Sequence, residues 1–268
     1  KFAFCHLLFT EEWFLNITFF HHSVSFLFYN KDIFVSCLFV FVCIFVFVPY
    51  PSIIIFPEKT FPILSKNTFQ YNRARNYLKN RGFTEDDIMR YDIKYCEDSC
   101  TNMVNRIIIP SYDSTGNLNT YNARTINSEF PKYREPSNVN KNAIVGFEYF
   151  INWNLPVVLV EGMLDAKAVK HNAIPLFGTY LTNLTKIKIL ENKSVVYVCL
   201  DSEAYEYALN ISEQLLNCGI EVYLTALPDG QDPSSLGYVK IWEYIMESTR
   251  VDSEYIMKNR LFYELTHD

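Results

Sequence analysis

The second half of the chain alternates between short apolar runs and amphipathic stretches. Two of the runs, 157–160 (Val-Val-Leu-Val) and 195–200 (Val-Val-Tyr-Val-Cys-Leu), contain no charged residue. Runs this short and this rich in valine are typical of strands that are buried on both faces of a parallel sheet. Two further strands are predicted at 174–177 and 220–227.

Amphipathic segments separate these strands. Helices are predicted at 163–170, at 182–191 with Thr182 as the N-cap, and at 203–217, where Gly219 ends the helix. The resulting order is β-α-β-α-β-α-β. Chain-connection rules fold this order into an open parallel sheet with helices on both faces, so the predicted fold class is α/β.

Acidic residues follow two of the predicted strands directly. Glu161 comes after the run 157–160, and Asp201 and Glu203 come after the run 195–200. Ligands of parallel sheets bind beyond the carboxyl ends of the strands, so these three carboxylates are expected at one edge. With no nearby Lys or Arg to neutralise them, they predict a site for hard divalent cations and hence phosphoryl-transfer chemistry.

Residues 62–156 have a different pattern. Thr84, with Asp87 three residues later, predicts a capping box that begins a short helix. The segments 107–112 and 118–125 predict a hairpin. This part of the chain is therefore expected to be a small α+β subdomain that precedes the parallel sheet.

Charge differs between the two parts. Residues 62–156 contain 12 Lys and Arg against 10 Asp and Glu, whereas residues 157–237 contain 5 against 10. A neutral to basic lobe beside an acidic, metal-binding lobe suits a groove for nucleic acid and nucleotide triphosphate. The net charge of the whole chain, −6, argues against a strong sequence-independent DNA binder.

Four acidic and glycine motifs occur in a fixed order along the predicted sheet. They are Glu161-Gly162 with Asp165, then Gly178-Thr179, then Asp201-x-Glu203, then Asp232-Pro233. This order resembles the Toprim domain that primases of the bacterial and phage type share with topoisomerases and some nucleases. The family pattern has Asp-x-Asp where this chain has Glu203 as the second acid, so a shifted metal geometry and a degenerate site both stay open.

The preceding subdomain also resembles a known one, the basic subdomain that precedes Toprim in bacterial-type primases. The matching stretches are 77–83 (Tyr-Leu-Lys-Asn-Arg-Gly-Phe), 105–110 (Asn-Arg-Ile-Ile-Ile-Pro), Gly116, Ala123-Arg124 and 131–133 (Pro-Lys-Tyr). The two resemblances together imply the catalytic core of a Toprim-type DNA primase, phage-like in its small size. Such an enzyme is a DNA-directed RNA polymerase that synthesises short RNA primers for replication.

The resemblance also implies roles for particular residues. Two Mg²⁺ or Mn²⁺ ions would be held by Glu161, Asp201 and Glu203, with Asp165 and Asp232 in support. Phosphates of the template and the nucleotide would be contacted by Arg106, Arg124, Lys132 and Lys141. A base would stack on Tyr133. The expected partners are single-stranded DNA, ribonucleoside triphosphates and a replicative helicase on a separate chain.

Two other functions stay open at this point. One is a Toprim nuclease using the same acids, which the primase-like subdomain disfavours. The other is a catalytically degenerate Toprim module that binds nucleic acid or a replication partner, which Glu203 favours. A type I topoisomerase would need a nucleophilic tyrosine in a further large domain, for which 268 residues are too few.

The two ends of the chain differ from its middle. Residues 1–61 are rich in Phe, Val and Ile, and 33–48 is a run of 16 residues of which only Ser36 is not apolar. Two interpretations stay open, a membrane anchor or sequence that is not part of the functional protein. Residues 238–268 predict a helical tail. We expect a location in the cytoplasm, that of the host for a phage protein, and no membrane partner unless the first segment is genuine.

Overall fold

The computed structural model describes residues 53–267, so the expectations for residues 1–52 lie outside the described part. The described residues form two five-stranded sheets with different topologies. One sheet is antiparallel and belongs to the first half of the chain, here called the antiparallel lobe (residues 53–150). The other belongs to the parallel lobe (residues 157–267). This mixed α/β architecture confirms the predicted fold class.

The antiparallel lobe keeps its strands in chain order. They are β1 (Thr60–Pro62), β2 (Lys94–Cys96), β3 (Arg106–Tyr112), β4 (Leu118–Thr125) and β5 (Tyr133–Arg134). Its helices are α1 (Phe69–Asn80) and α2 (Glu85–Arg90), followed by the 3₁₀ turns η1 (Lys141–Ala143) and η2 (Glu148–Phe150). The predicted hairpin is confirmed as β3 paired with β4.

The capping box that starts α2 is also confirmed. The Thr84 hydroxyl accepts a hydrogen bond from the Asp87 backbone N–H at 3.1 Å, and the Asp87 carboxylate accepts one from the Thr84 N–H at 2.9 Å. Two of the backbone donors at the start of the helix are thereby satisfied.

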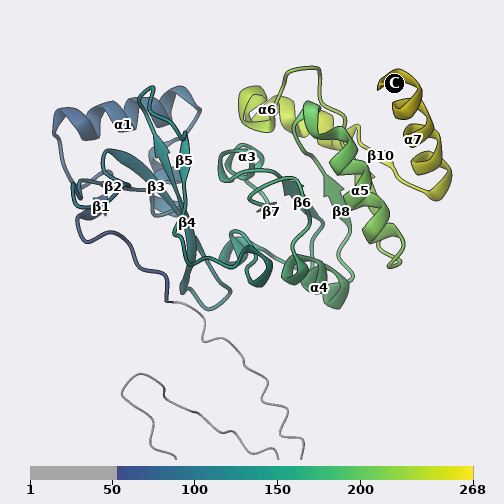
Figure 1. Cartoon of the computed structure of the whole chain (residues 1–268), viewed down its shortest axis with the longest axis horizontal. Helices are drawn as coiled ribbons and strands as arrows, with labels where there is room; N and C mark the ends of the chain where they lie inside the picture. The colour runs from purple at the N-terminus through teal and green to yellow at the C-terminus, as the bar shows by residue number, and fades with distance from the viewer. Residues whose placement is uncertain (1–52, 268) are drawn as a thin grey trace, which may run out of the picture. The chain divides into compact units, whose positions relative to one another are not determined.

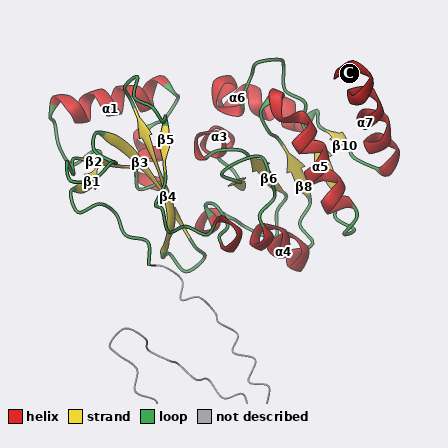
Figure 2. Ribbon diagram, in the orientation of Figure 1, coloured by secondary structure: helices red, strands yellow, loops and turns green. Residues whose placement is uncertain are grey.

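The parallel lobe has the strand order β10-β9-β8-β6-β7. Its parallel strands are β6 (Val157–Val160), β7 (Ala173–Pro175), β8 (Val196–Val198) and β9 (Val222–Leu224). Along the chain, these strands alternate with the helices α3 (Met163–Val169), α4 (Asn183–Asn192) and α5 (Tyr205–Leu216), with the 3₁₀ turn η3 (Ser202–Ala204) before α5 (Figure 2). All four predicted strands and three predicted helices are present.

The C-terminal part differs from its prediction in two ways. Helix α6 (Pro233–Met246) is interrupted at Gly237, whose backbone is not helical, so the part from 238 to 246 starts where the tail was predicted. The turn before Gly237 was not predicted; Asp232 caps it and accepts a hydrogen bond from the Ser235 N–H at 2.7 Å. Strand β10 (Thr249–Arg250), absent from the prediction, pairs antiparallel with β9 before α7 (Ser253–His267). No helix within residues 53–267 is long and apolar enough to span a bilayer.

One of the three buried hydrophobic clusters among residues 53–267 contains residues of both lobes. Leu78 of α1 and Ile107 of β3 belong to the same buried cluster as Val160 of β6, Met163 of α3 and Ile241 of α6. Residues of β6, α3 and α6 therefore share a core cluster with residues of the antiparallel lobe. Figure 1 shows α3 on the side of its lobe that faces β4 and β5.

Candidate metal and nucleic-acid site

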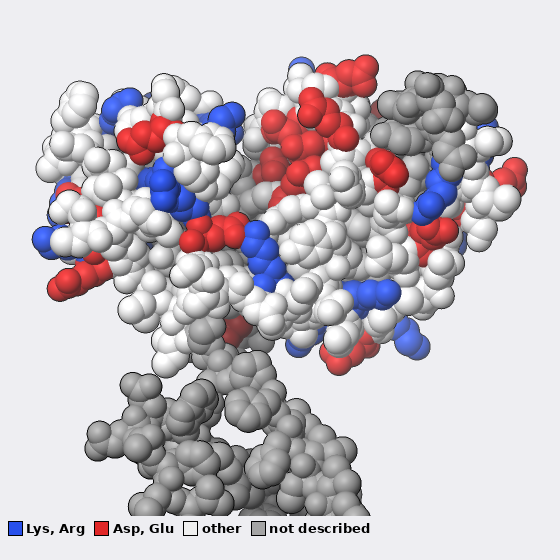
Figure 3. All heavy atoms as spheres, in the orientation of Figure 1, with Lys and Arg blue, Asp and Glu red and all other residues white. Residues whose placement is uncertain are grey.

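Four carboxylates lie near one another at the carboxyl edge of the parallel sheet. Glu161 directly follows β6, and Asp201 lies three residues past the end of β8. The Glu161 carboxylate accepts a hydrogen bond from the Asp201 backbone N–H at 3.3 Å. Asp165, in the first turn of α3, accepts hydrogen bonds from the Gly162 and Ser234 N–H groups at 3.1 and 3.2 Å. These contacts bring α3 to the start of α6, where Asp232 is the N-cap. On the face shown in Figure 3, acidic side chains gather near α5 and α6.

The close approach of Asp165 explains why residue 162 is a glycine. A Cβ atom at position 162 would lie 2.9 Å from the Asp165 carboxylate oxygen that accepts its N–H. A side chain there would push the carboxylate away from its donor. The motif thus combines an acid at the strand end with a glycine that lets Asp165 close over the helix start.

Burial and neighbouring negative charges raise the pKa values of Glu161, Asp165 and Asp201. Burial, reinforced by the charges of four neighbouring acids, raises the pKa of Asp201 to about 7. The pKa of Asp165 rises to about 6 through burial and the charges of Asp232 and Glu161, although two backbone N–H groups oppose the shift. The pKa of Glu161 is also raised, mainly by burial. Within the described part of the chain, no Lys or Arg forms an ion pair with any of these acids.

The donor set suits a hard divalent cation in its chemistry. One oxygen of Asp201 is buried with no hydrogen-bond partner, which is costly for a carboxylate unless a donor or a cation reaches it. The arrangement is not pre-formed, however, because residues 53–267 hold no group of three or more His, Cys, Asp or Glu side chains placed around one point. Glu203, in η3, is exposed and acts on Asp201 and Glu161 only through its charge.

A basic and aromatic cluster lies on the antiparallel lobe. The Arg124 guanidinium lies 4.4 Å from the centroid of the Tyr133 ring, and its Nε donates a hydrogen bond to the Tyr77 hydroxyl at 2.9 Å. Tyr133 is 39% exposed, and Asp165 is among the charges that raise the pKa of its phenol. The cluster therefore adjoins the acidic edge of the other lobe.

Two members of this cluster were missed as site residues. Tyr77 lies in α1 and Arg81 is the C-cap residue of that helix. The Arg81 guanidinium lies 5.2 Å from the Tyr77 ring centroid. Their four-residue spacing puts them on one face of a helix, which could have indicated a shared surface. Neither Arg81 nor Arg124 is ion-paired with a carboxylate among residues 53–267.

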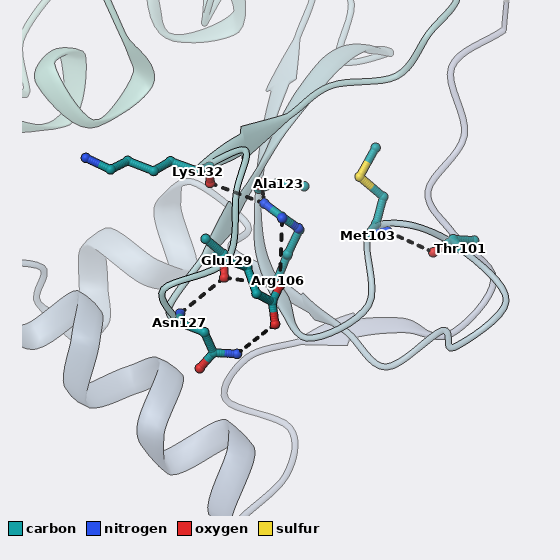
Figure 4. A network of polar contacts seen from close by, with 8 residues as sticks. Thr101, Met103, Arg106, Ala123, Asn127, Glu129 and Lys132 are labelled. Carbon is teal, nitrogen blue, oxygen red and sulfur yellow. Dashed lines mark hydrogen bonds and ion pairs between the residues drawn. The ribbon is translucent and has the colours of Figure 1, made fainter.

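Arg106, predicted as a phosphate contact, is instead buried in its sheet. Its side chain is 2% exposed, and Nη1 donates to the backbone carbonyls of Ala123 and Lys132 at 3.1 and 3.2 Å. Glu129 lies 3.8 Å away as an ion-pair partner (Figure 4). Arg106 joins β3, β4 and the start of β5, so it presents no guanidinium to a ligand in this structure.

We therefore expect Arg106→Met to act on stability. The change leaves the two carbonyls without this donor, and should lower the free energy of unfolding by about 2–4 kcal/mol. Urea denaturation measures the loss. Arg73→Met, at an exposed position of α1, is the matched control and should change stability by no more than about 0.5 kcal/mol. Equal stability of the two variants would contradict a structural role for Arg106.

The two predicted lysines have different surroundings. Lys132 is exposed, and its side chain extends away from the Arg106 network while its carbonyl takes part in it (Figure 4). Lys141 is already engaged, because Nζ lies 2.8 Å from the Glu135 carboxylate and donates to the Phe177 carbonyl at 3.1 Å. Lys132 is the freer of the two for a phosphate.

Comparison with known proteins identifies related sequences and folds. No family model matches the chain. It is 26% identical over 217 residues to the DNA primase of Staphylococcus epidermidis, an alignment that covers 62% of this chain and 36% of that protein. The chain therefore spans little more than a third of the length of that relative.

Solved structures agree on the fold. A DnaG primase catalytic domain bound to single-stranded DNA superposes with a TM-score of 0.60 at 19% identity, covering 74% of this chain and 78% of that one. A DNA primase domain from Pseudomonas aeruginosa gives 0.60 at 22% identity, covering 71% and 76%. In sequence this chain is thus similar to DNA primases of bacteria, and it has the fold of the DnaG catalytic core.

Proposed function

We propose that this chain is the catalytic core of a DNA primase, a nucleotidyltransferase that synthesises short RNA primers on single-stranded DNA during replication. The observation that carries the proposal is the acidic cluster at the carboxyl edge of the parallel sheet, adjoined by an arginine–tyrosine cluster on the antiparallel lobe. The relatives named DNA primase support it, as does the shared fold with a DnaG domain that binds single-stranded DNA.

The acids have a proposed division of labour. Glu161, Asp201 and Glu203 would hold two divalent cations, Mg²⁺ or Mn²⁺, and Asp165 and Asp232 would keep the cluster in place through their contacts at the starts of α3 and α6. When bound, such ions supply activation of the attacking 3′-hydroxyl and neutralisation of charge on the leaving pyrophosphate. The protein's own contribution is a partly buried edge where, among residues 53–267, the carboxylates have no Lys or Arg as an ion-pair partner.

The basic side chains would position the substrates. The Arg124 and Arg81 guanidinium groups, held by tyrosines and free of carboxylate partners within the described residues, suit phosphates of the nucleotide or the template. The partly exposed Tyr133 ring suits stacking on a base. Lys132 would add a further phosphate contact, whereas Lys141 would first have to leave Glu135.

The proposal extends to partners and location. The template is single-stranded DNA and the substrates are ribonucleoside triphosphates. Unwound template would come from a replicative helicase on a separate chain, and the reaction would take place in the cytoplasm, that of the host for a phage protein.

A primer-synthesis assay tests the function. The full chain is incubated with single-stranded DNA, labelled ribonucleotides and Mg²⁺ or Mn²⁺, and short labelled products are expected. Degraded template without products would indicate a nuclease. Binding of DNA without either reaction would favour a degenerate module, the alternative that the exposed Glu203 and the absence of a pre-formed metal group in residues 53–267 support.

We expect Arg124→Gln to weaken binding of single-stranded DNA and to make it less sensitive to salt. Losing one phosphate contact should reduce the slope of log K against log salt concentration by about 0.7. Fluorescence anisotropy of a labelled oligonucleotide across a salt series measures the slope. Arg73→Gln, at an exposed position of α1, is the control for loss of one positive charge. Equal slopes for the two variants would remove Arg124 from the phosphate-binding surface.

A further inference from the structure

Lys167 is a buried cation on α3 whose polar contacts all lie in the antiparallel lobe. The residue is 4% exposed. Its Nζ donates to the Gly82 carbonyl at 2.5 Å, lies 4.0 Å from the Phe83 ring centroid and lies 3.6 Å from the Asp87 carboxylate. Gly82 and Phe83 lie in the turn between α1 and α2, and Asp87 lies in the first turn of α2. Lys167 therefore inserts its amino group from one lobe into a turn of the other.

Burying a lysine amino group is unfavourable unless the charge is paired and hydrogen-bonded. Gly82 and Asp87 supply that compensation. The same Asp87 oxygen that accepts the Thr84 N–H in the capping box of α2 also lies 3.4 Å from the Lys170 Nζ. The Asp87 carboxylate thus connects the start of α2 with Lys167 of α3 and with Lys170, the C-cap residue of α3. A shift of α3 relative to α2 would remove both the Gly82 hydrogen bond and the Asp87 ion pair from the Lys167 amino group.

The same short helix carries the acidic cluster at its other end. Asp165 lies in the first turn of α3 and is held by the Gly162 and Ser234 N–H groups, while Lys167 follows two residues later. A helix of seven residues has little freedom to bend between these points. Fixing Lys167 in the α1–α2 turn therefore fixes where α3 presents Asp165 relative to the antiparallel lobe.

We propose that Lys167, paired with Asp87, is a positioning residue that holds the arginine–tyrosine cluster of the antiparallel lobe in register with the acidic cluster of the parallel lobe. The inference rests on the proposed function in one respect, since the alignment affects a reaction only if both clusters act on the same substrate. It predicts that each cluster keeps its own binding when the link is cut, while their joint chemistry is lost.

Two exposed cysteines, one in each lobe, allow the alignment itself to be measured. Cys100 lies between β2 and β3, and Cys218 follows α5, whereas Cys96 and Cys199 are buried. Spin labels are placed on Cys100 and Cys218 in the full chain, with Cys5, Cys37 and Cys43 changed to Ser. Pulsed electron paramagnetic resonance then gives the distribution of the distance between the lobes.

Lys167→Met keeps the apolar stem and removes the charge, and we expect it to broaden this distribution. Lys186→Met, on α4, is the matched control, because the Lys186 amino group forms no ion pair within the described residues. Asp87→Asn is a second, milder variant, since its amide oxygen can still accept the Thr84 N–H of the capping box. Distributions as narrow as that of the unmodified chain in both Lys167→Met and Asp87→Asn would overturn the proposal.

Kinetics separate positioning from packing. In Lys167→Met, kcat for primer synthesis should fall on the order of tenfold to a hundredfold through misalignment, with Mn²⁺ affinity and DNA affinity unchanged. Parallel loss of all three in both variants would indicate a merely structural role and would also overturn it. If the unmodified chain makes no primers, the proposed function fails, and the distance distribution still decides whether Lys167 positions the lobes.

Discussion

Glu161→Gln should abolish primer synthesis while leaving the protein folded, with a loss on the order of 10²–10³-fold or more. Glutamine keeps the shape of the side chain, and its amide oxygen can still accept the Asp201 N–H that Glu161 accepts at 3.3 Å. It removes one negative charge from an edge where burial and neighbouring acids already raise the pKa values of Glu161 and Asp201. The substitution therefore removes a cation ligand without removing a structural contact.

The measurement is primer yield per unit time beside circular dichroism and urea denaturation of the same sample. Glu191→Gln is the control, because Glu191 is an exposed residue of α4. It should retain full synthesis. Synthesis by Glu161→Gln at the rate of this control would rule out the metal role of Glu161, and lost synthesis together with lost structure would point to a folding defect instead.

Much of the parallel lobe could be predicted because its signals are local. A strand buried on both faces must be apolar along its whole length, so the runs that become β6 and β8 stand out, and the acids at their ends follow by position. The signals for the capping box of α2 and for Thr182 as the N-cap of α4 are equally local, since each involves two residues three positions apart.

Contacts between distant segments could not be read in this way. Arg106 looked like any other basic residue of a basic subdomain, and its burial depends on carbonyls of Ala123 and Lys132 that only the sheet brings to it. The short strand β10 has no apolar run because it pairs by backbone at the edge of the sheet. The insertion of Lys167 into the α1–α2 turn depends on how two lobes pack, which no local spacing encodes.

The other large effect concerns the stability of the metal-free protein, which Asp201→Asn should raise at neutral and higher pH. The pKa of Asp201 is about 7 in the folded chain, against an ordinary value of 3.8. Between these values the folded state holds a proton that the unfolded state has released. Stability from this group is thus fully present below pH 3.8 and is lost as pH rises through about 7.

Asparagine carries no such charge, so the variant escapes this loss. At pH 8 in a chelator, Asp201→Asn should exceed the unmodified chain in free energy of unfolding on the order of 1–3 kcal/mol. The difference should shrink steadily toward pH 4. Asp229→Asn, at an exposed loop position outside the set of charges that act on Asp201, is the control and should show no such pH-dependent gain.

Adding Mg²⁺ should reverse the order of the two proteins. A cation that binds only the folded state stabilises it by mass action, and it also neutralises the repulsion that the carboxylates otherwise impose on one another. The unmodified chain should gain stability with Mg²⁺, while Asp201→Asn should gain little, because it lacks the carboxylate whose buried oxygen has no protein donor. Urea denaturation at pH 8 with and without Mg²⁺ measures both gains. Equal Mg²⁺ stabilisation of the two proteins would mean that Asp201 is not a cation ligand, and the repulsion at this edge would then have to serve another purpose.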